Sequence, residues 1–171
     1  MDFLQKQIRK KNLMFCNALI MLLIILDQLT KAIAIRYLLG KPVISFLAGF
    51  VQFEYAENRG AFLSLGANLS EEMRTWIFVF GVVGILAFCA YSLWKFAHEG
   101  WSAFAFSLLI AGGMGNLIDR VSQGYVVDFV HMGFSNWLRT GVFNVADMAI
   151  SLGVVILLIR TYLKKDEDVT T

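Results

Sequence analysis

Three carboxylates and two amides stand close together in the sequence, among residues that are otherwise almost entirely apolar. The acids are Asp119, Asp128 and Asp147, and the amides are Asn116 and Asn144. In a water-soluble protein such a scatter would mean little. Ionisable groups inside or beside membrane-spanning segments are costly to place, so in a membrane protein they indicate a functional site. Whether these polar residues indicate a functional site therefore depends first on whether the chain crosses a membrane.

The composition indicates an integral membrane protein. Of the 171 residues, 58% are hydrophobic and only 16% are charged, whereas soluble domains are about half apolar and a quarter charged. The formal net charge of +2 is too small to indicate a nucleic-acid partner. Cys16 and Cys89 both fall in apolar runs, which predicts buried thiols rather than a disulfide or a metal-binding pair.

Hydropathy predicts an all-α polytopic membrane protein, a single integral membrane domain over residues 1–171. The apolar runs predict four transmembrane helices at about 13–35, 75–94, 101–120 and 143–163, with long loops at 36–72 and 121–142. A basic head followed by an apolar run also describes a signal peptide, but no small-x-small cleavage site follows it. The dense basic residues before the first span predict that both termini are cytoplasmic and that both long loops face outward.

The first outer loop has the pattern of a small extramembrane sheet. Gly40 and Pro42 end the helical pattern, and Val51 to Tyr55 alternate apolar with polar residues, which is the period of a strand. We therefore expect a small extramembrane β-cradle in the first outer loop.

Acids from three different predicted helices converge at one depth. At 1.5 Å per residue, Asp27, Asp119 and Asp147 lie roughly 18–27 Å from the inner surface, in the outer half of the membrane. Helical spacing puts Lys31 on the same face as Asp27, and Asn116 on the same face as Asp119. The polar groups therefore gather beside the two outer loops.

Three kinds of protein fit this convergence. The polar residues can be inert interhelical contacts, and transporters and proton relays also use intramembrane acids, although usually at several depths. A paired-carboxylate enzyme explains why acids gather at one interface, because two close carboxylates share a proton. The ionised one then activates water while its neutral partner donates to the leaving group. A metal site would rest on Asp128 and His131, which are three residues apart.

Five ordered motifs distinguish between these alternatives, because they resemble the motif set of bacterial lipoprotein signal peptidase (signal peptidase II). The resemblance covers residues 13–163. The motifs are Asp27-Gln28-x-x-Lys31, Asn58-x-Gly60-Ala61, Gly112-Gly113-x-Gly115-Asn116-x-x-Asp119-Arg120, Val127-Asp128-Phe129 and Phe143-Asn144-x-Ala146-Asp147. One departure is Phe62-Leu63, where family members often have Ala-Phe.

The resemblance implies a membrane aspartyl endopeptidase that needs no metal or cofactor. Such an enzyme removes the signal peptide from prolipoproteins by cleaving on the amino side of a diacylglyceryl-modified cysteine. It implies a multi-pass protein of the bacterial cytoplasmic (inner) membrane, with its active site facing outward. We expect it to be a monomer whose partners are the prolipoprotein and membrane lipids.

Carried over motif by motif, the resemblance also implies roles for individual residues. Asp128 and Asp147 are expected to form the catalytic pair. A polar shell is expected to orient this pair and to contact the substrate, and it comprises Asn58, Gly60, Asn116, Arg120 and Asn144. Structural polar roles are expected for Asp27, Lys31 and Asp119.

Overall fold

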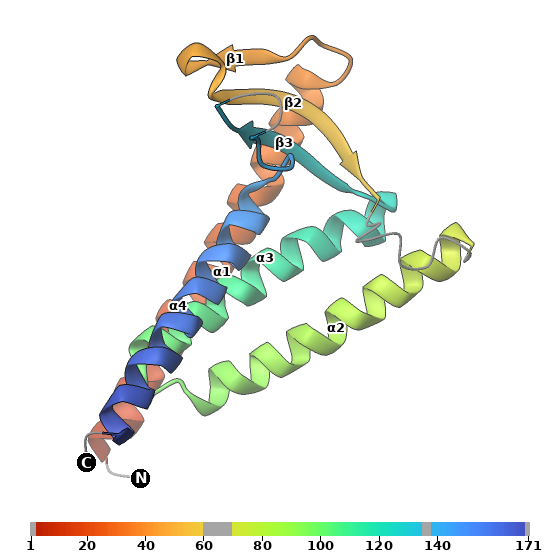
Figure 1. Cartoon of the computed structure of the whole chain (residues 1–171). Coiled ribbons are helices and arrows are strands. Elements are labelled where there is room, and N and C mark those ends of the chain that lie inside the picture. Colours follow the sequence, from red (N-terminus) through yellow and green to blue (C-terminus); the bar gives the residue numbers. More distant parts are fainter. Residues whose placement is uncertain (1–2, 60–69, 135–137, 170–171) are drawn as a thin grey trace.

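Four long helices and a small sheet make up the fold of the computed structural model, which describes residues 3–59, 70–134 and 138–169. The helices are α1 (Phe3–Leu38), α2 (Glu71–Lys95), α3 (Gly100–Gln123) and α4 (Val145–Val169). The start of α1 and the end of α4 lie at one end of the bundle, and the sheet lies at the other (Figure 1). All four helices are long and apolar enough to cross a membrane, which confirms the predicted fold class.

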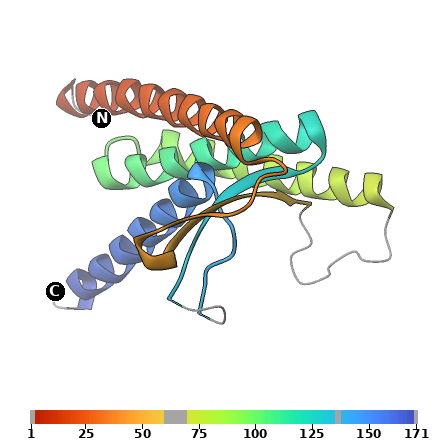
Figure 2. The same cartoon turned by 90° about the horizontal axis from the view of Figure 1, so that it is seen from above.

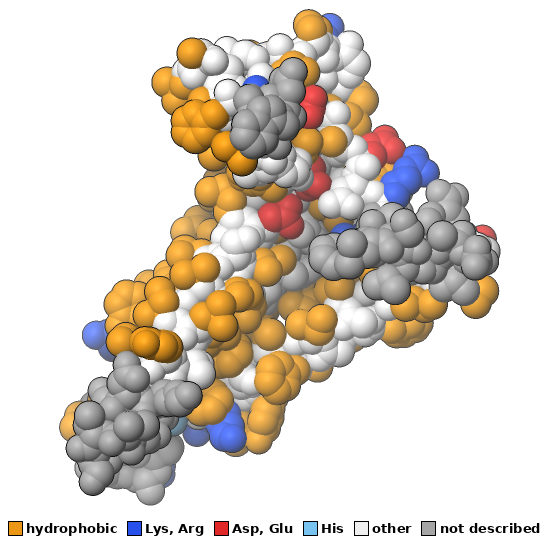
Figure 3. Space-filling view, in the orientation of Figure 1, with side chains coloured by type: hydrophobic (Ala, Val, Ile, Leu, Met, Phe, Trp, Pro, Cys, Tyr) orange, Lys and Arg blue, Asp and Glu red, His pale blue; other side chains and the backbone are white. Residues whose placement is uncertain are grey.

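The outer surface of the helices is apolar, as a lipid environment requires. Large side chains such as Trp76, Phe80 and Phe88 are more than half exposed. Hydrophobic side chains cover much of the helical surface, whereas acidic side chains gather between the helices and the sheet (Figure 3). An exposed apolar surface of this extent marks contact with a membrane or with a partner.

Helix α3 is the central helix of the bundle. About half of its apolar window (56%) is buried, against 17–22% in the other three helices. It packs against α1, α2 and α4, and the view from above shows α1 and α4 diverging on either side of it (Figure 2). The polar residues of α3 therefore lie within reach of α1 and α4.

Two glycines allow α3 to approach its neighbours closely. A Cβ atom at Gly112 would collide with the carbonyl oxygen of Ala146 and the side chain of Ile150 on α4. A Cβ atom at Gly115 would collide with the carboxylate of Asp27 on α1. These small residues bring the backbones together, and any larger side chain at either position would push the helices apart.

The sheet is antiparallel and has the strand order β1-β2-β3. Its strands are β1 (Ile44–Phe46), β2 (Val51–Asn58) and β3 (Val126–Met132), and a 3₁₀ turn, η1 (Leu47–Gly49), joins the first two. The predicted β-cradle in the first outer loop is confirmed for β1 and β2. The third strand comes from the segment 121–142, which we expected to be only a loop.

Strand β3 was not predicted from the sequence, because the side chains on both faces of its first four residues are buried. Residues Val126, Val127 and Phe129 are buried along with Asp128, so the sequence lacks the alternation of a half-exposed strand. Val127 and Phe129 pack in one cluster with Ala34 and Leu38 at the end of α1. The sheet is thereby held against the C-terminal end of α1.

The largest differences from the predicted spans are at the start of α1 and the end of α4. Helix α1 begins at Phe3 rather than near residue 13, because Lys, Arg and Gln are good helix formers and extend the helix beyond its apolar part. Helix α4 begins at Val145 and continues to Val169, six residues past the predicted end at 163. Its start is set by side-chain caps that belong to the candidate site.

Candidate active site

The N-terminus of α4 is held by a reciprocal capping box. The side-chain oxygen Oδ1 of Asn144 accepts a hydrogen bond from the backbone N–H of Asp147 at 2.9 Å. In return, Oδ2 of Asp147 accepts from the backbone N–H of Asn144 at 3.2 Å. A third acceptor is Asp27 on α1, whose Oδ1 accepts from the N–H of Ala146 at 2.9 Å. These contacts satisfy backbone donors that a helix start leaves free, and they fix the position of Asp147.

Asp128 reaches the same place from the sheet. It lies on β3 and is only 2% exposed. Its Oδ1 accepts a hydrogen bond from Nδ2 of Asn144 at 2.6 Å, and its Oδ2 accepts from Nδ2 of Asn58 at 3.1 Å. Asn58 lies at the end of β2, diagonally across the β2–β3 ladder, which pairs Asn58 with Val126.

Asn116 on α3 links the two acids into one network. Its Nδ2 donates to Oδ1 of Asp147 at 2.8 Å. Its Oδ1 accepts from Nδ2 of Asn144 at 3.1 Å and from the ammonium of Lys31 at 3.0 Å. Because Nδ2 of Asn144 donates both to Asn116 and to Asp128, the two carboxylates are connected through the side chains of Asn116 and Asn144.

The surroundings of Asp128 favour its protonated form. Burial raises the pKa of its carboxyl from an ordinary value of 3.8 to about 6, and the negative charge of Asp147 adds to this rise. The hydrogen bonds from Asn58 and Asn144 and the positive charge of Lys31 act in the opposite direction. A carboxyl whose pKa lies near 6 can gain and lose a proton close to neutral pH, as a general acid or base must.

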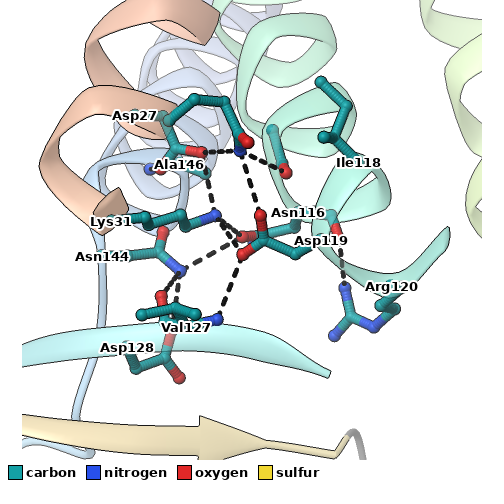
Figure 4. A network of polar contacts seen from close by, with 12 residues as sticks. Asp27, Lys31, Asn116, Ile118, Asp119, Arg120, Val127, Asp128, Asn144 and Ala146 are labelled. Carbon is teal, nitrogen blue, oxygen red and sulfur yellow. Dashed lines mark hydrogen bonds and ion pairs between the residues drawn. The ribbon is translucent and has the colours of Figure 1, made fainter. Parts of the chain in front are cut away.

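A buried ionic cluster lies on the bundle side of these acids. Lys31 pairs with Oδ2 of Asp27 at 2.8 Å and with Oδ2 of Asp119 at 3.0 Å. Asp119 also accepts from the backbone N–H of Val127 at 3.1 Å, which ties the end of α3 to β3. Nε2 of Gln28 lies within 3.2 Å of both Asp carboxylates. Figure 4 shows how α1, α3 and β3 converge on this cluster.

The expected same-face pair of Asp27 and Lys31 is therefore present, and Asp119 has its partners on other elements. Arg120 lies at the edge of the network (Figure 4), where its Nη1 donates to the backbone carbonyl of Asn116 at 3.4 Å. Gly60 lies outside the described residues. Sequence reasoning assigned no role to Gln28, although its spacing of three residues from Lys31 puts the two side chains on neighbouring positions of one helix face.

Asp128 and His131, the alternative metal pairing, have different partners in the structure. Residues three apart on a strand point to opposite faces of the sheet. Nε2 of His131 lies 2.7 Å from the side-chain oxygen of Gln52, and its Nδ1 lies 3.7 Å from Glu54, both on β2. Among the described residues, no three His, Cys, Asp or Glu side chains gather in a way that could hold a metal ion.

An open cavity adjoins Asp147. Its volume is about 390 Å³, and it runs along the first turns of α4 and the segment before it. The lining residues are Thr140, Gly141, Val142, Phe143, Asp147, Met148 and Ser151. The site thus combines an accessible carboxylate, a second carboxylate buried behind it and a partly apolar opening.

The family model described as "Signal peptidase (SPase) II" matches residues 19–163. The lipoprotein signal peptidase of Streptococcus pneumoniae is 38% identical over 82% of this chain and 88% of its own length. The lipoprotein signal peptidase of Streptococcus pyogenes serotype M1 is 36% identical over 92% of this chain and 97% of its own length. A solved bacterial membrane enzyme superposes with a TM-score of 0.76 at 29% identity, covering 90% of each chain. With the resemblance of its motifs confirmed in this way, the chain belongs to the lipoprotein signal peptidase (signal peptidase II) family.

Proposed function

We propose that this protein is an aspartyl endopeptidase that removes the signal peptide from diacylglyceryl-modified prolipoproteins, cleaving on the amino side of the lipidated cysteine. The observation that carries the proposal is the network in which Asn116 and Asn144 hold Asp128 and Asp147 together. Two carboxylates in unlike environments divide the roles of acid and base, because one stays protonated where the other is ionised.

In the proposed reaction the pair holds one proton between its two members. The ionised carboxylate takes a proton from a water molecule, whose oxygen bonds to the carbonyl carbon of the scissile peptide. The protonated carboxyl donates to the carbonyl oxygen as the tetrahedral intermediate forms. When the C–N bond breaks, a proton passes to the departing amine, and the signal peptide leaves with a new carboxylate.

The surroundings of the pair suit a substrate that is anchored by lipid. The cavity at Asp147 includes the apolar side chains of Phe143 and Met148. The helices below it expose apolar side chains, such as Leu152 and Val155 on α4. Acyl chains attached to the cysteine can therefore remain in the membrane while the peptide bond reaches Asp147. We expect a monomer to suffice, because residues of a single chain contribute both carboxylates.

We also propose that both termini are cytoplasmic and that the site faces outward in the bacterial inner membrane. Basic residues crowd the start of α1, at Lys6, Arg9, Lys10 and Lys11. The sheet lies at the opposite end of the bundle (Figure 1). Asp128 is on its strand β3, and Asp147 is in the first turn of α4. Positively charged segments stay on the cytoplasmic side, which supports this orientation.

The test is cleavage of a diacylglyceryl-modified prolipoprotein by the purified full-length protein in detergent, followed by mass spectrometry of the products. We expect the wild type to release the signal peptide and to leave the lipidated cysteine as the new N-terminus. Asp147→Asn should abolish release, since a pair with one permanently neutral member cannot activate water. A matched acid-to-amide control is Glu99→Gln, which alters the ion pair with Arg160 at the other end of the bundle and should retain cleavage.

Two results would contradict the proposal. One is near-normal turnover by Asp147→Asn, and the other is equal cleavage of the same substrate without its diacylglyceryl group. Loss of activity on chelation, with recovery on adding Zn²⁺, would contradict the expected metal-free chemistry.

A further inference from the structure

Lys31 is a buried cation whose three contacts use all the donors of its ammonium. It is 2% exposed. Two of its contacts are the ion pairs with Asp27 and Asp119, and the third is a hydrogen bond to Oδ1 of Asn116 at 3.0 Å. An ammonium group has three N–H donors and no acceptor, so this environment leaves none unused. The two ion pairs explain how a charge can be buried here.

The hydrogen bond from Lys31 to Asn116 is not needed to neutralise the buried charge. It fixes the orientation of the Asn116 side-chain amide. The carboxamide of Asn116 could in principle be turned by 180°, which would exchange its oxygen and nitrogen. In that orientation its NH₂ group would face the ammonium of Lys31, donor against donor, and its oxygen would face the carboxylate of Asp147. With Lys31 in place, Oδ1 of Asn116 faces the cation (Figure 4). Its Nδ2 then donates to Oδ1 of Asp147 at 2.8 Å.

We infer that Lys31 is a positioning residue for the acid pair, acting through Asn116 so that the amide N–H is directed at Asp147. This inference rests on the proposed function and adds to it a residue that touches neither carboxylate of the pair. Asn144 also donates to Oδ1 of Asn116, but its Nδ2 is shared with Asp128 and with the carbonyl oxygen of Val127. Lys31 is the charged donor to that oxygen, and charge-assisted hydrogen bonds are about twice as strong as neutral ones.

The same cation also acts on the pair through its field. Its positive charge lowers the pKa of Asp128, against the effects of burial and of Asp147. Among the described residues, Lys31 from α1 and Arg120 from α3 place positive charge near the pair. Asp27 and Asp119 pair with Lys31. Replacing Lys31 with a neutral residue of similar length therefore moves the ionisation of Asp128 to higher pH.

The test compares Lys31→Met with Gln28→Met in the full-length protein. Both positions lie on α1 and contact the same two carboxylates, but only Lys31 contacts Asn116. For Lys31→Met we expect kcat to fall about ten- to a hundredfold with little change in KM, because the lost contact acts on the reacting pair. The acidic limb of its pH–rate profile should move to higher pH. Gln28→Met should lower the thermal midpoint but keep its pH profile and a kcat within about threefold of wild type.

Lys31→Met leaves the buried carboxylates of Asp27 and Asp119 without their cation, so this variant could fail to fold. A second pair of variants tests the inference in that case. The double variant Lys31→Met/Asp119→Asn keeps the net charge of the cluster, and Asp119→Asn alone is its reference. The readout is the titration midpoint of Asp128, taken from the dependence of the thermal midpoint on pH, which needs no activity. The inference requires a higher titration midpoint in the double variant than in its reference.

The outcomes separate this inference from the proposed function. If wild-type protein cleaves the lipidated substrate and Lys31→Met behaves like Gln28→Met in both kcat and pH profile, Lys31 is structural only. An unchanged titration midpoint in the double variant overturns the inference in the same way. If the wild type cleaves no lipidated substrate, the proposed function fails, while the titration still reports whether Lys31 acts on the pair.

Discussion

Replacing Asp128 with Asn should make the stability of the protein much less sensitive to pH, in addition to abolishing cleavage. Burial and the charge of Asp147 raise the pKa of Asp128 from 3.8 to about 6 in the folded protein. The folded state therefore holds the proton of Asp128 more tightly than the unfolded chain does. Protonation of this group stabilises the fold, and that stabilisation is lost as the pH rises from about 4 to about 6.

The magnitude follows from the pKa difference. One pKa unit corresponds to about 1.4 kcal/mol, so ionising Asp128 costs the folded state about 3 kcal/mol by pH 8. Asn at this position resembles the protonated carboxyl and has no such cost. Relative to wild type, Asp128→Asn should therefore gain about 3 kcal/mol between pH 4 and pH 8. For a chain of this size that corresponds to roughly 6–12 °C in the thermal midpoint.

The assay is a thermal denaturation series in detergent at pH 4, 5, 6, 7 and 8, with wild type and Asp128→Asn measured side by side. The informative quantity is the difference between the two midpoints at each pH, because effects of the detergent and of other titrating groups cancel. Glu99→Gln, at the opposite end of the bundle, serves as the acid-to-amide control. A difference for Asp128→Asn that stays constant from pH 4 to pH 8 would refute the reasoning about its burial.

Three further predictions test the packing and the orientation. Gly115→Ala should lower the thermal midpoint by the equivalent of roughly 1–3 kcal/mol, because its methyl group would collide with Asp27; an unchanged midpoint would contradict the close helix contact. Asp119→Asn should lower stability by roughly 3–5 kcal/mol, since it weakens the pairing with Lys31; a wild-type midpoint in a catalytically dead variant would instead assign Asp119 to the chemistry. In a cysteine-accessibility scan of intact cells, positions 42–49 should react with an impermeant reagent and positions 96–99 should not, and the reverse pattern would invert the proposed orientation.

The helices could be predicted from the sequence because their causes are local. Uninterrupted apolar runs of about 20 residues are long enough to cross a bilayer, and nothing distant in the chain is needed to recognise them. Strand β2 was predictable for a similar reason, since the alternation from Val51 to Tyr55 lies within the segment itself. The shared face of Asp27 and Lys31 also followed from helical spacing alone, and their ion pair is present.

Contacts between distant segments were decided only by the tertiary structure. Strand β3 needed β2 to pair with and α1 to pack on, and its buried residues lack any alternation that would mark a strand. The sequence by itself determined which polar residues stand near the helix ends that lie beside the two long loops. Only the fold determined that Asp27 caps α4, that Lys31 joins Asp119 to Asn116, and that Asn144 reaches Asp128. The physical reason is that a buried polar group must find a partner somewhere, and the close approach of the helices at Gly112 and Gly115 decides which partners are within reach.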